Sequence, residues 1–291
     1  QKYRRQFLPY FIAGLSVTAG LVWFAVFEFE ARQGLLFVHF FDVGQGDAIF
    51  IEASCGNQAL IDGGPDEAVL AKLGDAMPFW DRSIDLLILT HPHADHLDGL
   101  IAVLKRYRVG MVLESGVNHS IPEYQEWRRL LTEKGVKVIT AKAGERLRLG
   151  ENIYLDVLAP LDDFFGKSPK DIHDATVIAK LTHGQTSILF TGDAEKSLEH
   201  RLLFSNFYFL DSDILKVGHH GSKTSTAEDF LKAVSPEVAV ISAGRKNRYG
   251  HPHQDVLDRL SAISAKIFRT DRDGDIVFVS NGVQFSLYKE N

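Results

Sequence analysis

The 291-residue chain is poor in cysteine: Cys55 stands alone, so no intrachain disulfide can form and no thiolate pair is available to bind a metal. It also lacks low-complexity segments and internal repeats with a period of 20–50 residues. Basic residues do not outnumber acidic ones, and the net charge of -6 argues against a broad polyanion-binding surface, although not against a local one. The 45% hydrophobic content is enough for the core of one large domain or two small ones.

The one long uncharged segment lies near the start of the chain. Residues 7–27 carry no charge and are long enough to cross a bilayer core as a helix. Lys2, Arg4 and Arg5 precede this segment and two glutamates follow it closely, which predicts a cytoplasmic N-terminus and a following domain outside. A signal peptide and a buried helix of a soluble protein are the alternatives. Because Gln1 is not an initiator, we expect a processed product or a piece of a longer protein.

From residue 35 onward, short apolar strands alternate with amphipathic helices in two similar halves. Strands at 35–41, 48–52 and 58–61 are joined by tight turns, as in an antiparallel meander, and strand–helix alternation follows them. The same progression starts again near residue 146. Two mixed sheets packed face to face, with helices outside both, would bury such strands on both sides. We therefore expect the chemistry on loops at one shared edge.

The densest group of polar side chains follows the apolar strand at 86–89. Three histidines and two aspartates lie between residues 91 and 98, among them His91, His93, Asp95 and His96. Neutral imidazole and carboxylate groups are ligands of borderline metals such as zinc and manganese. A histidine-rich surface turn is the alternative, but so many polar groups at the exit of a buried strand would be costly to desolvate without a cation.

Other predicted strands also end in acidic or histidine residues. Asp62 follows the strand at 58–61, Asp193 follows the strand at 186–190, and His219 with His220 follows the strand at 214–217. Strand ends that converge on one edge combine rigid support with open access. This pattern predicts a single polar site that is assembled from distant segments.

These residues resemble a known signature. The spacing from His91 to His96, preceded by Asp62-Gly63-Gly64 and followed by Gly192-Asp193 and His219, resembles that of the metallo-β-lactamase superfamily. Five further segments resemble the C-terminal metallo-β-lactamase domain of the ComEC family of competence proteins, membrane channels for incoming single-stranded DNA: residues 41–47, 190–193, 219–225, 249–253 and 269–274.

The resemblance implies a fold and a domain organisation. The fold would be the α/β four-layer αββα sandwich of two mixed sheets, over residues 34–291. Residues 1–33 would comprise a basic cytoplasmic flank, a transmembrane helix and a linker. The hydrolase domain would lie on the extracytoplasmic side of the cytoplasmic membrane, periplasmic or extracellular.

The resemblance also implies a site for two divalent metal ions, zinc or manganese. His91 and His93 would bind the first ion, whereas Asp95, His96 and His219 would bind the second. Asp193 would bridge both ions. The superfamily usually supplies one more histidine to the first ion, and here either His173 or Asp174 could serve, or the position could be vacant.

Roles for neighbouring residues follow from this assignment. Asp62 would orient a ligand histidine. His251 or His220 would protonate the leaving alkoxide or bind a phosphate oxygen. Phosphate contacts are available from a run of four polar residues, Ser222, Lys223, Thr224 and Ser225. The alternative is that this run only caps the helix expected after residue 227.

The implied activity is hydrolysis of DNA by a hydroxide that bridges the two metal ions, with Asp95 and Asp193 in the catalytic centre. The substrate would be the strand that is not imported, and the partners would be single-stranded DNA, the membrane through residues 7–27, and the remainder of the competence channel. Two alternatives remain open: an extracellular phosphorylcholine-type or other small phosphodiester hydrolase, and a non-catalytic module that threads DNA.

Overall fold

The computed structural model describes residues 2–205 and 210–288, and the chain divides into two compact units, Gln1–Leu35 and Leu36–Asn291. The first unit contains helix α1 (Lys2–Arg32). Within the described residues, no helix combines the length and the apolar character needed to cross a bilayer. The membrane span expected over residues 7–27 is not confirmed and stays a prediction.

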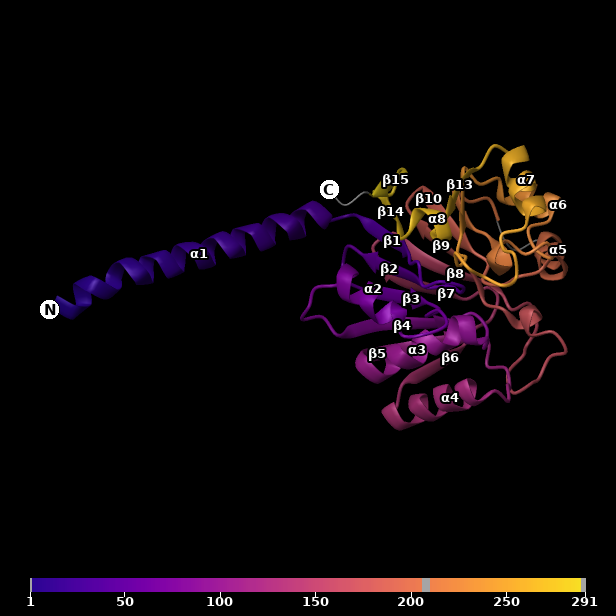
Figure 1. The fold of residues 1–291 in the computed structure, drawn as a ribbon, viewed down its shortest axis with the longest axis horizontal. Helices are drawn as coiled ribbons and strands as arrows, with labels where there is room; N and C mark the ends of the chain where they lie inside the picture. Colours follow the sequence, from indigo (N-terminus) through magenta and orange to yellow (C-terminus); the bar gives the residue numbers. More distant parts are fainter. Residues whose placement is uncertain (1, 206–209, 289–291) are drawn as a thin grey trace. The chain divides into compact units, whose positions relative to one another are not determined.

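The second unit contains two mixed sheets (Figure 1). The first sheet has the strand order β15-β14-β1-β2-β3-β4-β5-β6. Its strands are β1 (Leu36–Phe40), β2 (Ile49–Ala53), β3 (Gln58–Ile61), β4 (Ser83–Leu89), β5 (Arg108–Glu114), β6 (Lys137–Thr140), β14 (Ile276–Ser280) and β15 (Phe285–Tyr288). The second sheet has the order β13-β12-β11-β10-β9-β8-β7. Its strands are β7 (Arg146–Gly150), β8 (Ile153–Ala159), β9 (Ile178–His183), β10 (Thr186–Phe190), β11 (Ile214–Lys216), β12 (Val238–Ile241) and β13 (Lys266–Arg269).

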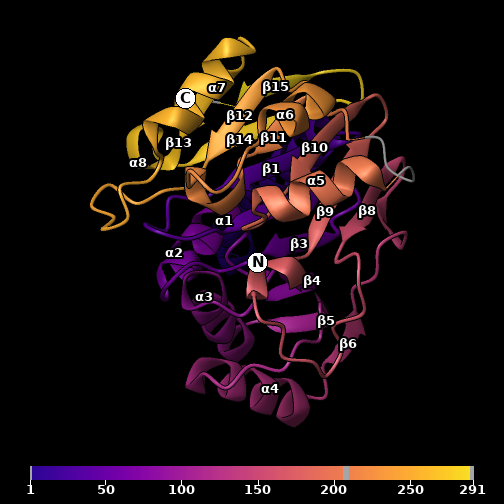
Figure 2. The ribbon, with the colours of Figure 1, turned by 90° about the vertical axis from the view of Figure 1, so that its right-hand side faces the viewer.

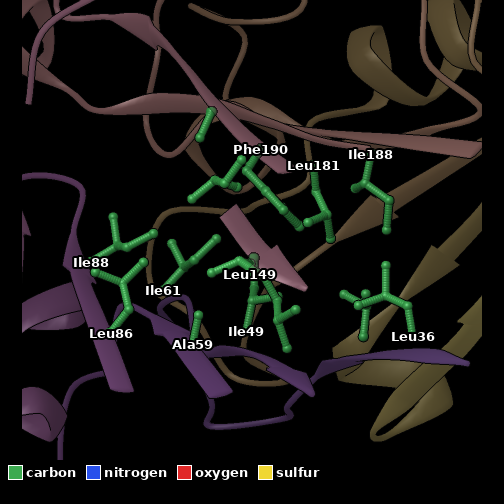
Figure 3. Close-up of a cluster of buried hydrophobic side chains, with 14 of the residues drawn as sticks. Leu36, Ile49, Ala59, Ile61, Leu86, Ile88, Leu149, Leu181, Ile188 and Phe190 are labelled. Carbon is green, nitrogen blue, oxygen red and sulfur yellow. The ribbon is translucent and has the colours of Figure 1, made fainter. Parts of the chain in front are cut away.

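Helices cover the outer face of each sheet (Figures 1 and 2). The first sheet is covered by α2 (Ala68–Ala76), α3 (Ala94–Arg106) and α4 (Pro122–Lys134). The second sheet is covered by α5 (Lys196–Phe204), α6 (Glu228–Val234) and α7 (Gln254–Ala262). A third apolar core lies between the sheets (Figure 3). In this core the Phe40 and Phe190 rings are 6.3 Å apart. The predicted two-sheet sandwich with helices outside is confirmed.

Strand direction brings the functional loops to one edge. Strands β3 to β6 run parallel to one another, and so do β10 to β13, so their carboxyl ends lie together within each sheet. Because β1 and β2 form an antiparallel hairpin next to β3, the turn at 41–48 reaches the same edge as the end of β3. Likewise β9 is antiparallel to β10, so the segment that precedes β9 reaches the edge where β10 ends.

The last strands depart from the half-by-half organisation that the sequence pattern indicates. Strand β13 completes the second sheet, but β14 and β15 return to the first sheet, where β14 pairs with β1. A short helix, α8 (Thr270–Asp273), lies between β13 and β14. The C-terminal strands therefore fasten the second half of the chain to the first strand of the fold.

A buried carboxyl group holds the start of α6. The Glu199 side chain, on α5, accepts hydrogen bonds from the backbone N–H groups of Thr226 and Ala227, at 2.6 and 2.8 Å. Burial raises the pKa of Glu199 from 4.5 to about 7, although these two hydrogen bonds act in the opposite direction. The carboxyl group therefore binds its proton more tightly in the folded chain than in the unfolded one.

We predict that Glu199→Gln reduces the loss of stability between pH 4.5 and pH 8. Because the pKa of Glu199 is higher in the folded chain than in the unfolded one, its contribution to the free energy of unfolding is fully present below the unfolded pKa of 4.5. This contribution, at most about 3 kcal/mol, is lost as the pH rises through 7. Glutamine keeps an acceptor oxygen and does not ionise. Urea unfolding of both proteins across this pH range is the measurement, and parallel pH profiles would contradict the prediction.

Candidate metal centre

The histidine-rich segment forms the turn between β4 and α3. The strand ends at Leu89, the helix begins at Ala94, and the histidine rings of the turn lie close together because the turn is tight. His91 Nε2 is 3.0 Å from His93 Nδ1, and the rings of His91 and His96 are 4.3 Å apart. These side chains are close together in the chain, which is why their spacing could be recognised in the sequence.

Asp62 holds the third histidine of this segment. Its carboxylate lies 2.7 Å from His96 Nδ1 and accepts hydrogen bonds from the Thr90 N–H and hydroxyl groups, at 2.9 and 2.7 Å. The contact requires close packing of two backbones, since a Cβ atom on Gly99 would lie 1.8 Å from the Gly63 carbonyl oxygen. Asp62 therefore contacts the histidine in the way that a carboxylate orients a ligand imidazole, with Nε2 left to face the site.

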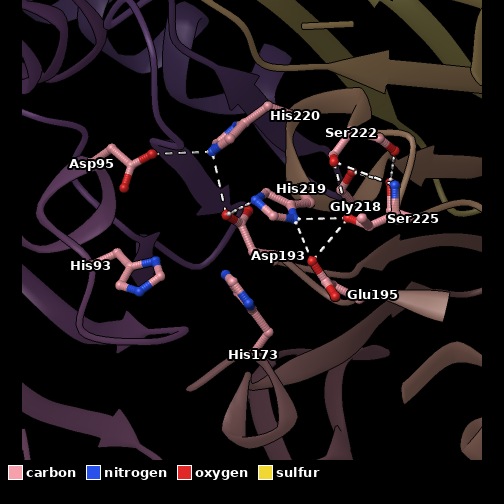
Figure 4. A network of polar contacts seen from close by, with 12 residues as sticks. His93, Asp95, His173, Asp193, Glu195, Gly218, His219, His220, Ser222 and Ser225 are labelled. Atoms are coloured by element: carbon pink, nitrogen blue, oxygen red, sulfur yellow. Dashed lines mark hydrogen bonds and ion pairs between the residues drawn. The ribbon is translucent and has the colours of Figure 1, made fainter. Parts of the chain in front are cut away.

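Asp193 lies at the centre of the cluster, only 2% exposed. Its Oδ2 atom is 3.5 Å from His220 Nε2 and 3.9 Å from His219 Nε2 (Figure 4). The same atom is 3.3 Å from His96 Nε2 and 3.8 Å from His91 Nε2. Its Oδ1 atom is buried and makes no hydrogen bond. One carboxylate from the second sheet thus faces histidines from both sheets.

His173, rather than Asp174, faces the histidines of the first sheet. It lies on a single 3₁₀ turn, Ile172–Ala175, and its donor nitrogen is within 4.8 Å of those of His91 and His93. The carboxylate of Asp171 is 3.0 Å from His173 Nδ1, whereas the buried Nε2 makes no hydrogen bond.

His219 and His220 point to different parts of the cluster. Both have left-handed backbone conformations, with φ of 46° and 53°, inside the short turn Gly218–Gly221. The donor atoms of Asp95, His96 and His220 lie within 4.8 Å of one another, and those of His173, Asp193 and His219 form another such group. This differs from the expected grouping of His219 with Asp95 and His96, because the turn rotates adjacent side chains away from each other.

Asp47 and Lys216 also belong to the cluster, although the sequence did not single them out as site residues. The two side chains are fully buried and form an ion pair, and the Lys216 ammonium also donates to the Gly192 carbonyl at 3.0 Å. Asp47 Oδ1 lies 3.5 Å from His220 Nδ1. Nothing in the sequence distinguishes Lys216 within its apolar strand. Its position beneath the Asp193 loop shows that it belongs to the site.

The remaining predicted residues differ in exposure. The His251 ring is 5.8 Å from that of His219, and Lys223 and Thr224 are both exposed. Ser225 is fully buried, and its hydroxyl donates to the Gly218 carbonyl at 2.8 Å. Ser222 shares a hydrogen bond with Thr224 at 2.9 Å. Ser225 therefore supports the loop, so it does not present its hydroxyl to a substrate.

The donor set fits divalent cations. Burial lowers the pKa of His91 well below its usual value and that of His93 to about 4, with neighbouring histidines adding to both effects. These imidazoles are therefore neutral, the form that coordinates metals. The unpaired Asp193 Oδ1 and His173 Nε2 atoms face the same cluster, and a cation would satisfy both.

The comparisons agree with this geometry. The model of the Metallo-beta-lactamase superfamily matches residues 41–245, most of the second unit. The chain belongs to this superfamily. Among solved structures, the diiron β-hydroxylase CmlA from Streptomyces venezuelae shares the fold with a TM-score of 0.52 and 16% identity, over 80% of this chain and 52% of that one. The superfamily match and the cluster of histidines and aspartates together indicate a centre for divalent metal.

Curated relatives narrow the resemblance to the ComEC family of competence proteins. ComE operon protein 3 of Bacillus subtilis is 32% identical over 95% of this chain and 38% of its own length. Competence protein ComA of Neisseria gonorrhoeae is 33% identical over 68% of this chain and 25% of its own length. The chain thus spans well under half of the length of these relatives.

We predict that His220→Ala weakens binding of one divalent ion more than His219→Ala does. The former removes a donor from the group of Asp95 and His96, whereas the latter leaves that group intact. Metal content per chain after gel filtration is the measurement, with His200→Ala, an exposed histidine on α5, as the control. If His219→Ala alone lost the ion bound by Asp95 and His96, the grouping seen here would be wrong.

We predict that Lys216→Met destabilises the fold by roughly 3 kcal/mol, because it leaves the buried Asp47 carboxylate without its ammonium partner. The double variant Asp47→Asn, Lys216→Met removes both charges and should recover part of this loss. Urea unfolding of the wild type, the single variants and the double variant measures the coupling. A loss of stability in the double variant equal to the sum of the losses in the two single variants would show that the pair is not coupled.

Proposed function

We propose that this chain is the metal-dependent phosphodiesterase domain of a longer DNA-uptake protein and that it hydrolyses DNA. The observation that carries the proposal is the arrangement of two donor groups around one shared carboxylate: His91, His93 and His173 on one side, and Asp95 with His96 and His220 on the other. Asp193 lies between these groups. Two divalent ions held in this way would activate water and neutralise charge that develops on a phosphodiester.

The protein residues around the donors supply positioning and charge. The exposed Lys223 ammonium stands on the loop that follows His220 and is available to a nonbridging phosphate oxygen. Burial and the nearby His220 and His219 rings lower the pKa of His251 to about 4, so this imidazole is neutral at ordinary pH. It is therefore suited to hydrogen bonding with a phosphate oxygen rather than to delivering a proton as imidazolium.

The setting of the domain is part of the proposal. Since the chain spans 38% of the Bacillus subtilis relative, we infer that further segments of the same protein complete the DNA-uptake channel. The basic residues before position 7 and the glutamates after position 27 support an extracytoplasmic site at the cytoplasmic membrane. The strand that is not imported would be the substrate, and single-stranded DNA the form that is bound.

We predict that the chain supplemented with manganese or zinc cleaves a labelled DNA oligonucleotide, and that Asp193→Asn lowers the rate at least 100-fold. This carboxylate contacts both donor groups, so its loss affects every ion in the centre. Gel electrophoresis of single-stranded and double-stranded substrates measures cleavage. Asp229→Asn, an exposed aspartate on α6, is the matched control and should cleave at the wild-type rate.

The same assay separates the alternatives. Hydrolysis of small phosphodiesters such as a phosphorylcholine ester, with no cleavage of DNA, would favour the small-substrate hydrolase. Binding of DNA without hydrolysis of any phosphodiester, at full metal content, would favour the threading module. Either result would overturn the nuclease proposal and leave the metal centre intact.

A further inference from the structure

The loop between β12 and α7 differs in charge from the rest of the chain. Residues 243–253 contain three basic side chains, Arg245, Lys246 and Arg248, and no acidic one, in a protein whose net charge is -6. All three are exposed. A local basic patch of this kind attracts a phosphate backbone even where the whole molecule does not.

This loop has a defined conformation. The Asn247 side chain donates hydrogen bonds to the Gly244 and His251 carbonyls at 2.8 and 2.7 Å, and it accepts one from the His251 N–H at 2.9 Å. The Gly244 N–H donates to the Gln45 side chain at 3.2 Å, and a Cβ atom on Gly244 would lie 2.7 Å from the Gln45 nitrogen. The loop is thus tied to the turn that follows β1.

Tyr249 projects from this loop beside the metal centre. Its side chain is 51% exposed, and its ring stacks on His251 with a centroid distance of 5.7 Å and an interplanar angle of 25°. The Arg248 guanidinium lies 5.1 Å from the Tyr249 ring centroid and donates to its hydroxyl at 2.9 Å. His251 in turn lies 5.8 Å from His219, so one line of rings runs from the exposed tyrosine to the donor cluster.

The flank beyond Asp95 has the opposite charge. A pocket of about 410 Å³ near α3 and α4 is lined by five acidic side chains and one basic one, Lys105. The acidic side chains are Asp66, Glu67, Asp98, Glu123 and Glu126. A polyanion is repelled from this flank, so the basic loop is the favourable direction of approach to the centre.

We propose that Tyr249 is a stacking site for a nucleobase of single-stranded DNA, in which the base takes the place of the Arg248 guanidinium over the ring. Arg248 then joins Arg245 and Lys246 next to the phosphates. This inference rests on the proposed function and names how that site holds its substrate. An exposed aromatic ring with flanking basic residues matches the way proteins bind single strands, by base stacking together with backbone electrostatics. A base on Tyr249 positions a neighbouring phosphodiester toward the donor cluster.

The first test measures binding without turnover. A single-stranded oligonucleotide that carries 2-aminopurine is titrated with the full chain in the presence of EDTA, and stacking is followed as quenching of its fluorescence. Tyr249→Ala should weaken binding about tenfold and remove most of the quenching, and Tyr249→Phe should retain both. Tyr288→Ala, an exposed tyrosine on β15, is the matched control and should behave as wild type.

The second test measures cleavage by the metal-loaded chain. Tyr249→Ala should raise KM for the normal oligonucleotide about tenfold with a much smaller change in kcat, and replacement of the stacked nucleotide by an abasic one should raise the wild-type KM similarly. The abasic substrate should not distinguish the variant from the wild type. Equal KM values and equal quenching for wild type and Tyr249→Ala would overturn the stacking site, even where DNA is cleaved.

The two tests distinguish loss of the nuclease activity from loss of the stacking site. A wild-type chain that cleaves no DNA but shows quenching dependent on Tyr249 would contradict the nuclease activity and support the stacking site. Quenching lost equally in Tyr249→Phe, with circular dichroism unchanged, would assign the effect to the hydroxyl and its contact with Arg248 and would overturn stacking.

Discussion

The structure depends on a buried negative charge, the carboxylate of Asp193, at the junction of the two sheets. An ionised carboxylate that is removed from water needs compensating partners, and here they come from both halves of the chain. The Asp193 carboxylate lies 3.3 Å from His96 Nε2 and 3.5 Å from His220 Nε2, and although burial acts to lower the pKa of both imidazoles, Asp193 and neighbouring carboxylates raise them above the usual value. The same carboxylate keeps one oxygen unpaired. The buried carboxylate is therefore stabilised by imidazole partners and still has an oxygen available to bind a cation.

The junction is held by backbone and packing as well as by charge. The Val177 N–H donates to the Thr90 carbonyl at 2.9 Å, which joins the segment before β9 to the end of β4. Gly192 packs so closely against Thr90 and Thr176 that a Cβ atom there would lie 2.7 Å from the Thr176 side chain. Beneath the site, Lys216 bridges Asp47 and the Gly192 carbonyl. Rigid support from both sheets sets the distances between donors more firmly than any single loop could.

Charge is distributed unevenly around this junction. The pocket near α3 and α4 is lined mainly by acidic side chains, whereas the loop at 243–253, which contains His251, carries only basic charges. The net charge of -6 therefore hides a local contrast. For binding of a polyanion, the arrangement of a few exposed arginines and lysines matters more than their total number.

The sequence by itself determined the local features of the site. His91, His93, Asp95 and His96 are close in the chain, so their common turn, the preceding strand and the two-sheet pattern could be recognised from spacing and periodicity. The motifs also pointed to Asp193 as the partner from the second half. Short-range sterics and hydrogen bonding determine local geometry of this kind, so it can be predicted from a single sequence.

Only the tertiary structure decided which distant groups meet. Whether His173 or Asp174 faces the cluster depends on one 3₁₀ turn, and the separate directions of His219 and His220 depend on two left-handed residues. Lys216 pairs with Asp47 across the two sheets, and β14 crosses back to β1. Such contacts arise from the packing of segments far apart in the chain, and neither periodicity nor spacing encodes which buried side chains that packing will bring together.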